Sequence, residues 1–347
     1  MKAIVQDHYG SSERLALREV RKPEIGASEV LIQVRAAGVN PADWAIMSGL
    51  PYIARPIYGM RKPKVSVRGT DVAGVVETVG SGVTRFKPGD EVFGSGHGSF
   101  ADYAAGSEDE LALKPTNLTF EQAAAVPMAS LVALQALRKG NVRAGQKVLI
   151  NGASGGIGTF AVQIAKSLGA HVTGVSSTRN MDLVRSLGAD EVIDYTQHDF
   201  TQNGVLYDFI LDNVSNHSLA QLRHSLTPAG TLVPNGGRFD HRWLASGGRI
   251  IYGMLLFRFG NQKLGNFLVS MKQDDLLVVK ELIETGKVMP VIDRTYRLDE
   301  TSQAIAHVGG GHARGGGRTR GKVAITFAQR PSPATVHVAI GGSPASA

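Results

Sequence analysis

The chain is predicted to be an α/β protein in which a doubly wound parallel sheet follows a smaller, mainly β, barrel-like domain. Before residue 121, short β-like runs are separated by turns rich in glycine and proline. From Val148 onward, apolar strand-like runs alternate with helical patterns at the spacing of βαβ units. With 347 residues, the chain is long enough for two domains.

The first domain is expected to be an antiparallel barrel. Met1 to Gln6 is typical of an opening strand and has no long apolar region of the kind found in a signal peptide. Further strands are expected at Glu29 to Arg35, Val72 to Val79 and Glu91 to Gly94. The period changes at Phe120, where a long helical pattern runs to Lys139.

The second domain is expected to begin at residue 122, near the start of that helix. Its strands and helices are predicted at Val148 to Ile150, Phe160 to Lys166, His171 to Val175, Met181 to Leu187, Val192 to Asp194, Phe209 to Asn213, Leu219 to Leu226, Thr231 to Pro234 and Asp274 to Gly286. Val291 to Leu298 and a helix after Asp299 are expected to return to the first domain. The predicted domains are therefore 1–121 with 290–328, and 122–289. Residues 329–347, rich in Pro, Ala, Gly and Ser, are expected to form a disordered tail.

Composition narrows the function classes. The absence of cysteine excludes disulfides, thiolate nucleophiles and cysteine-containing zinc sites, and it is compatible with a cytoplasmic location. The apolar stretch Ile250 to Phe259 is too short to span a bilayer. Much of the net charge of +7 lies in the C-terminal part. The basic run Gly309 to Lys322 lacks interleaved aromatic residues, which favours a solvated loop or a phosphate-facing segment over nucleic-acid binding.

A glycine-rich turn between a strand and a helix indicates a dinucleotide site. The segment from Val148 to Gly158 reads VLINGASGGIG, with Gly155 and Gly158 at the second and third glycine positions of the fingerprint. In such a turn the backbone approaches a pyrophosphate, and the helix N-terminus receives its negative charge. The expected cofactor-binding residues here are Ala153, Ser154, Gly155, Gly156, Ile157 and Gly158.

The next βα loop favours the phosphorylated cofactor, NADPH. Where an NAD site places an acidic ribose ligand, the chain reads Gly174 to Asn180 without a carboxylate. Ser176, Ser177 and Arg179 are candidates to bind a 2′-phosphate. An ordinary exposed loop would explain Arg179 but not the missing acid. Asn213 and Gly236 follow later strands, whose carboxyl ends are expected to face the nicotinamide half.

These motifs together resemble the medium-chain dehydrogenase/reductase superfamily, in its zinc-free quinone oxidoreductase (zeta-crystallin-like) branch. The resemblance covers about residues 1–327 and rests on the order of GVNPAD at 38–43, GTDVAGVV at 69–76, KPGDEV at 87–92 and GGIG at 155–158. It implies a Rossmann NADP-binding domain, a GroES-like catalytic domain and a homodimer. Zinc-dependent relatives hold their metal at positions that here resemble Asn40, Thr70 and Met128, none of them a plausible zinc ligand.

The resemblance also suggests individual roles. Asn40 and Tyr52 resemble a pair that approaches the nicotinamide in this branch, and Tyr195 resembles a residue beside the adenosine phosphate. For Asn40 and Tyr52 the simpler alternatives are a turn residue and a surface aromatic. Relatives end in a pattern like GHARGKV, into which this chain inserts Gly315 to Arg320. It therefore stays open which group reaches the cofactor phosphate: Arg314, Arg320 or Lys322.

The expected function is NADPH-dependent hydride transfer to a quinone or an α,β-unsaturated carbonyl without a metal, because such acceptors delocalise charge onto an oxygen. Two alternatives stay open: a zinc-independent alcohol dehydrogenase or ketone reductase, and an NADPH-binding protein without turnover. A short-chain dehydrogenase is excluded by order, since its Tyr-x-x-x-Lys spacing occurs only at Tyr58 and Lys62, upstream of the glycine turn.

Overall fold

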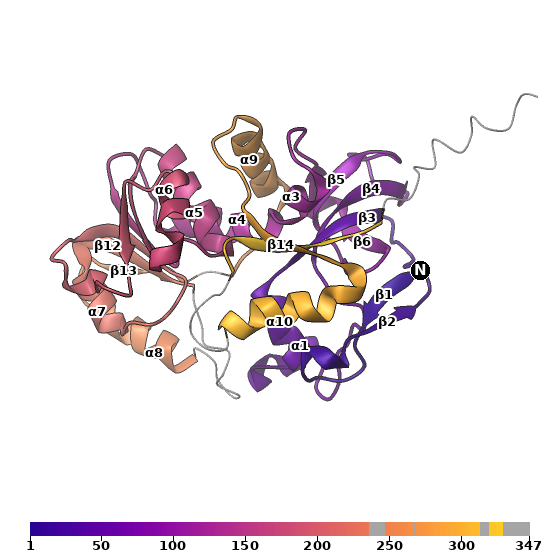
Figure 1. Ribbon diagram of the computed structural model, residues 1–347, viewed down its shortest axis with the longest axis horizontal. Coiled ribbons are helices and arrows are strands. Elements are labelled where there is room, and N and C mark those ends of the chain that lie inside the picture. Colours follow the sequence, from indigo (N-terminus) through magenta and orange to yellow (C-terminus); the bar gives the residue numbers. More distant parts are fainter. Residues whose placement is uncertain (236–246, 267, 313–318, 329–347) are drawn as a thin grey trace, which may run out of the picture.

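Two large sheets dominate the computed structural model, which describes residues 1–235, 247–266, 268–312 and 319–328 (Figure 1). In the six-stranded sheet all strands are parallel, and the order is β10-β9-β8-β11-β12-β13. The chain therefore reverses direction across the sheet between β8 and β11, the switch point of a doubly wound fold. The strands are β8 (Lys147–Asn151), β9 (His171–Ser176), β10 (Glu191–Asp194), β11 (Tyr207–Asp212), β12 (Leu226–Pro234) and β13 (Lys263–Leu264).

Helices cover both faces of this sheet. Val148 belongs to a core cluster with Leu131, Phe160 and Leu276, whereas its neighbour Leu149 packs with residues of the opposite face. This alternation follows from the period of a strand, whose successive side chains point to opposite faces. The helices are α4 (Pro127–Lys139), α5 (Gly156–Ser167), α6 (Met181–Ser186), α7 (Leu219–His224), α8 (Gly247–Leu256) and α9 (Gln273–Glu284).

The second sheet joins the two ends of the chain. Its order is β14-β15-β3-β4-β5-β7, with β6 also paired to β3. All of its pairs are antiparallel except β14 with β15. Its strands are β3 (Glu29–Val39), β4 (Asp71–Val79), β5 (Glu91–Ser95), β6 (Tyr103–Ser107), β7 (Leu111–Leu113), β14 (Ile292–Arg297) and β15 (Lys322–Thr326); β1 (Lys2–Val5) and β2 (Ala16–Glu19) pair separately. The two sheets confirm the predicted α/β class.

The single long helix expected over Phe120 to Lys139 is wrong. Two helices occupy this stretch, α3 (Phe120–Ala124) and α4, and Pro127 stands in the first turn of α4. A proline is accepted there because its missing N–H has no intrahelical partner, whereas inside a continuous helix its ring would clash with the preceding turn. The α3 helix has its own N-cap, Thr119, which accepts a hydrogen bond from the backbone of Gln122.

The remaining helices lie with the second sheet. The α10 helix (Thr301–His312) runs alongside α1 (Pro41–Ser48), and α2 (Arg55–Tyr58) is a single turn (Figure 1). Short 3₁₀ turns occur at Ser12–Arg14, Tyr52–Ala54, Glu108–Glu110, Thr178–Asn180, Phe200–Gln202 and Leu298–Glu300. Among the helices of the described residues, none is both long and apolar enough to cross a bilayer.

Candidate functional site

A cavity of about 370 Å³ lies where the two sheets meet. It is bordered by the end of β3, the turn after β8, the ends of β9 and β11, and the start of β15. Most of the residues expected to bind a cofactor line it: Ser154, Gly155, Gly156, Ile157, Gly158, Ser176, Ser177, Tyr195, Asn213 and Lys322, together with Asn40.

The glycine turn presents bare backbone to this cavity. Gly152 has a φ of +80°, which favours glycine, and a Cβ on Gly158 would lie only 2.1 Å from the carbonyl oxygen of Gly152. Gly155 is the extended N-cap of α5, and a Cβ there would come no closer than 3.4 Å to another atom. The N-cap of the twelve-residue α5 helix therefore leaves room for a ligand at the start of the helix, as a pyrophosphate requires. Ala153 is fully buried and does not line the cavity.

At the end of the cavity where the adenosine is expected, the loop after β9 contributes a lining residue that sequence reasoning missed. Arg179 is exposed and is not among the lining residues, but the adjacent Asn180 is. The Asn180 side chain is buried; its Nδ2 donates to Ser154 Oγ at 3.0 Å, and its Oδ1 has no hydrogen-bond partner. A buried oxygen without a donor suits a ligand hydroxyl. The only sequence signal for Asn180 is its place beside Arg179.

At the other end of the cavity, amide side chains form hydrogen bonds at the switch point of the parallel sheet. Asn151 Nδ2 donates to Asp212 Oδ1 at 2.9 Å. Asn213 Oδ1 accepts from Asn235 Nδ2 at 2.8 Å, while Asn213 Nδ2 is buried without a partner. An unpaired donor in a lined cavity fits the carbonyl or hydroxyl oxygen of a bound cofactor. Gly236, the other residue expected here, lies outside the described residues.

A buried polar cluster lies beside the glycine turn. Asn40, Asp71 and Lys322 are 3%, 0% and 4% exposed. Asn40 Nδ2 donates to Asp71 Oδ2 at 3.0 Å, and the Lys322 ammonium donates to Asn40 Oδ1 and lies 3.5 Å from Asp71 Oδ2. Asp71 also accepts the backbone N–H of Met128 at 3.3 Å. Burial raises the pKa of Asp71, and the Lys322 charge opposes that rise. Sequence reasoning missed Asp71, whose only signal is its place in the GTDVAGVV motif.

A second buried carboxyl lies beside this cluster. Asp43 accepts the backbone N–H of Asn40 at 2.8 Å, closing the first turn of α1. Burial raises the pKa of the Asp43 carboxyl to about 7, and the nearby Asp71 adds to the rise. The N-terminus of α1 thus holds Asn40 by its backbone while the cluster holds its side chain.

Unlike Asn40, Tyr52 does not line the cavity. Tyr52 begins the 3₁₀ turn Tyr52–Ala54, its ring is covered by the Arg55 guanidinium at 4.4 Å, and it is not among the lining residues. Its approach to a nicotinamide stays a prediction. Asn40, Thr70 and Met128 are the positions expected to correspond to the zinc ligands of relatives. Within the described ranges, no three His, Cys, Asp or Glu side chains gather as metal ligands would.

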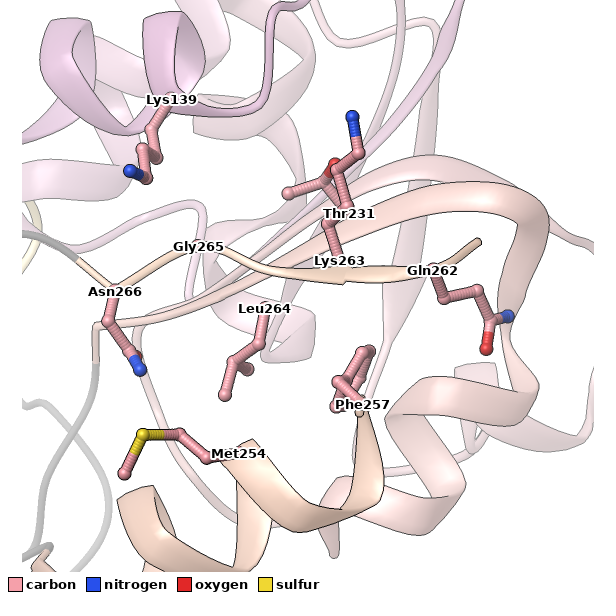
Figure 2. A pocket seen from close by; sticks show the side chains of 9 residues that line it. All are labelled: Lys139, Thr231, Met254, Phe257, Gln262, Lys263, Leu264, Gly265 and Asn266. Carbon is pink, nitrogen blue, oxygen red and sulfur yellow. The ribbon is translucent and has the colours of Figure 1, made fainter. Parts of the chain in front are cut away.

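A second cavity, of about 520 Å³, lies at the outer edge of the parallel sheet (Figure 2). In Figure 2, Met254 of α8 and Phe257, which directly follows this helix, face Leu264 of β13 across it. It contains no glycine turn and no buried polar cluster. The cavity between the sheets is therefore the candidate functional site.

A parallel sheet with a nucleotide-type glycine turn, facing a polar cluster on a second sheet, defines a nicotinamide-dependent oxidoreductase. The comparisons agree. Residues 26–116 match the alcohol dehydrogenase GroES-like domain family, and residues 187–325 match the zinc-binding dehydrogenase family. The chain belongs to the medium-chain dehydrogenase/reductase superfamily, in its quinone oxidoreductase branch.

Three relatives illustrate this membership. The chain is 32% identical over 332 residues to the chloroplastic quinone-oxidoreductase homolog of Spinacia oleracea, covering 91% of this chain and 97% of the relative. It is 33% identical to the chloroplastic NADPH-dependent alkenal/one oxidoreductase of Arabidopsis thaliana, covering 91% and 78%. The structure of the quinone oxidoreductase from Coxiella burnetii superimposes with a TM-score of 0.82 at 29% identity, covering 94% and 99%.

Proposed function

We propose that the protein uses NADPH to reduce quinones or α,β-unsaturated carbonyls without a metal ion. The observation that carries this proposal is the Asn40 side chain, a hydrogen-bonding group that lines the cavity beside the glycine turn. Relatives named quinone oxidoreductase and alkenal/one oxidoreductase support both acceptor classes. Two alternatives, a ketone reductase and a cofactor-binding protein without turnover, are distinguished from this function by the assay below.

When bound, the reduced nicotinamide supplies a hydride, that is two electrons and one proton, and the acceptor takes its second proton from solvent. The chain itself stabilises the acceptor oxygen that gains negative charge. Asn40 Nδ2 carries two hydrogens, one of which goes to Asp71, so the second is free to meet that oxygen. Inside a buried site such a donor acts more strongly than in water. Tyr52 is proposed as a second donor to the same oxygen.

The cofactor is proposed to lie along the parallel sheet. Residues 154–158 are proposed to bind the pyrophosphate and Asn213 and Gly236 the nicotinamide half, while Lys322 borders the turn; Ala153, which is buried, would only support the turn. We propose NADPH rather than NADH because no acidic side chain occurs in the loop after β9, where Ser176, Ser177 and Arg179, with Tyr195 nearby, can receive a 2′-phosphate. The unpaired Asn180 Oδ1 is a further candidate for a ribose hydroxyl.

We further propose a cytoplasmic homodimer of two-domain subunits, with residues 1–121 and 290–328 in one domain and 122–289 in the other. The predicted tail, residues 329–347, lies outside the described residues. The dimer is proposed to form along β13, because α8 beside it exposes Ile251, Met254 and Leu255 by more than half of their surfaces. Light scattering coupled to gel filtration tests the subunit number, and a Met254→Glu variant would then elute as a monomer.

The decisive experiment follows NADPH absorbance with 1,4-benzoquinone, an alkenal and a simple ketone side by side. We expect turnover with the first two, no loss of rate after treatment with a zinc chelator, and slower turnover with the ketone. Tight NADPH binding with no consumption by any acceptor would refute the enzyme. Faster reduction of the ketone would favour the ketone reductase.

A further inference from the structure

We propose that Lys322 is a positioning residue, which holds the side-chain amide of Asn40 with its NH2 group available to the substrate cavity. This inference rests on the proposed function, since it concerns how the Asn40 donor is kept in place. Asn40, Asp71 and Lys322 come from different parts of the chain and are joined by hydrogen bonds and an ion pair.

The ammonium of Lys322 has three N–H donors, and three oxygens lie around it. They are the carbonyl oxygen of Val39 at 3.3 Å, Asn40 Oδ1, and Asp71 Oδ2 at 3.5 Å. These oxygens therefore provide one acceptor for each of the three donors. The effect of Lys322 on the reaction therefore passes through its partners, above all Asn40.

The Asn40 amide lies between charges of opposite sign, and each charge can hydrogen-bond with only one end of the amide. An ammonium only donates, so it must meet the amide oxygen; a carboxylate only accepts, so it must meet the amide nitrogen. Rotating the amide by half a turn would place NH2 against the Lys322 ammonium and the oxygen against the Asp71 carboxylate. In a site where the three residues are at most 4% exposed, water cannot relieve either repulsion. Only one orientation of the amide is stable.

This orientation determines which group of the Asn40 amide, the NH2 or the oxygen, faces the cavity. One hydrogen on Asn40 Nδ2 points to Asp71 at 3.0 Å, and the other is left as a donor. The reversed amide would offer an oxygen, which would repel the charge that develops on a reduced quinone or enone. An asparagine side chain can both donate and accept hydrogen bonds. Lys322 and Asp71 together thus leave Asn40 with a donor available to the cavity.

The side chain of Lys322 fits closely into its surroundings, and this limits the substitutions that can test its role. The stem of Lys322 passes the glycine turn so closely that a Cβ on Gly156 would lie 3.0 Å from Lys322 Cδ. A methionine has a similar length and no charge, so Lys322→Met removes the donor of Asn40 Oδ1 without filling or emptying the space. Asn40→Ala removes the amide itself, and the two changes form a double-mutant cycle.

The cycle is measured as the hydride-transfer rate at saturating NADPH, with 1,4-benzoquinone or whichever acceptor the wild type reduces. We expect Asn40→Ala to lower the rate by about 100-fold, as the loss of one charge-stabilising donor does. Lys322→Met should lower it by about 10-fold, and should add less than about 2-fold in the Asn40→Ala background, with the dissociation constant of NADPH changed by less than about 2-fold. Independent, multiplying losses would overturn the proposal. So would a higher NADPH dissociation constant with an unchanged rate, the result expected if Lys322 bound the cofactor phosphate.

A second readout does not depend on activity. In protein labelled with ¹⁵N-asparagine, the Asn40 side-chain NH2 signal is identified by its absence in Asn40→Ala. We expect one hydrogen to exchange slowly because it is bonded to Asp71, and we expect this protection to fall in Lys322→Met. An unchanged signal would overturn the inference. A changed signal in a protein that reduces no acceptor would leave the inference standing and refute the proposed function instead.

Lys322→Met leaves Asp71 buried without its counter-charge and could unfold the protein. The variant Lys322→Met with Asp71→Asn removes both charges and keeps the site neutral. Neither restraint on the amide then remains, so its rate should fall at least as far as that of Lys322→Met while NADPH still binds. A wild-type rate in this double variant would overturn the proposal.

Discussion

The backbone N–H of Gly321 donates to the carbonyl oxygen of Ser154 at 2.9 Å, and this bond joins the start of β15 to the nucleotide-type turn of the other sheet. Gly155 and Gly321 also form a β-bridge. The residue after Gly321 is Lys322, whose ammonium reaches Asn40. One short segment therefore connects the expected cofactor turn with the proposed catalytic amide.

Replacing Gly321 should damage this connection. Gly321 has a φ of +90°, and a Cβ there would lie 2.3 Å from the carbonyl oxygen of Val291. We expect Gly321→Ala to lower the free energy of unfolding by about 2 kcal/mol or more, measured by urea denaturation. Gly89→Ala is the matched control, because Gly89 has a φ of +94° and nothing within 4 Å of a Cβ. Equal losses in the two variants would mean that the contact with Val291 has no effect.

Two glycines of the turn should respond differently to the same substitution. A Cβ on Gly158 would lie 2.1 Å from the Gly152 carbonyl oxygen, so Gly158→Ala should destabilise the fold. Gly155 has room, with its nearest atom at 3.4 Å, but its methyl would enter the space expected for a pyrophosphate. We expect Gly155→Ala to keep the melting temperature within a few degrees and to weaken NADPH binding by about 10-fold or more, measured by fluorescence titration. Wild-type NADPH affinity in Gly155→Ala would contradict the assignment.

Asp43 should make stability depend on pH. Its pKa is about 7 in the folded protein and near 3.8 in the unfolded chain, so the folded state holds the proton more strongly. Between about pH 4 and pH 7 the unfolded chain loses this proton while the folded protein keeps it. The stabilisation is therefore present below pH 4, is lost as the pH rises to 7, and changes no further above that.

The difference in pKa corresponds to a contribution on the order of a few kcal/mol. Asp43→Asn keeps an oxygen for the Asn40 backbone N–H and cannot titrate, so its free energy of unfolding should vary less between pH 5 and pH 7.5 than that of the wild type. Urea denaturation at both values checks this. The same pH dependence in both proteins would show that Asp43 does not cause it.

Arg179 should discriminate between the two nicotinamide cofactors. If it pairs with a 2′-phosphate, Arg179→Ala should raise KM for NADPH by about 10-fold and leave KM for NADH nearly unchanged. Arg185→Ala is the control, since Arg185 is exposed on the neighbouring α6 and pairs with Asp182 at 2.8 Å. Equal changes for both cofactors in Arg179→Ala would refute the phosphate role.

Much of the parallel sheet was predictable because its signals are local. The run VLINGASGGIG contains a strand, a turn that needs glycine and a helix start within eleven neighbouring residues. The break before α4 also has a local signal, Pro127, but the helical periodicity on both sides of it favoured one continuous helix. Asn180 was not predictable in the same way, since nothing in its neighbours reveals that its side chain turns inward to Ser154.

The sequence by itself determined the fold class, the glycine turn and the absence of cysteine ligands, because each depends on residue type and near neighbours. Only the tertiary structure decided how Asn40, Asp71 and Lys322 meet. The register of β15 against β3 aligns Val323 with Val39, and that of β3 against β4 aligns Gly38 with Asp71. Pairing between strands that are distant in the chain thus brings two buried opposite charges to the two ends of one amide, and no local pattern records that pairing.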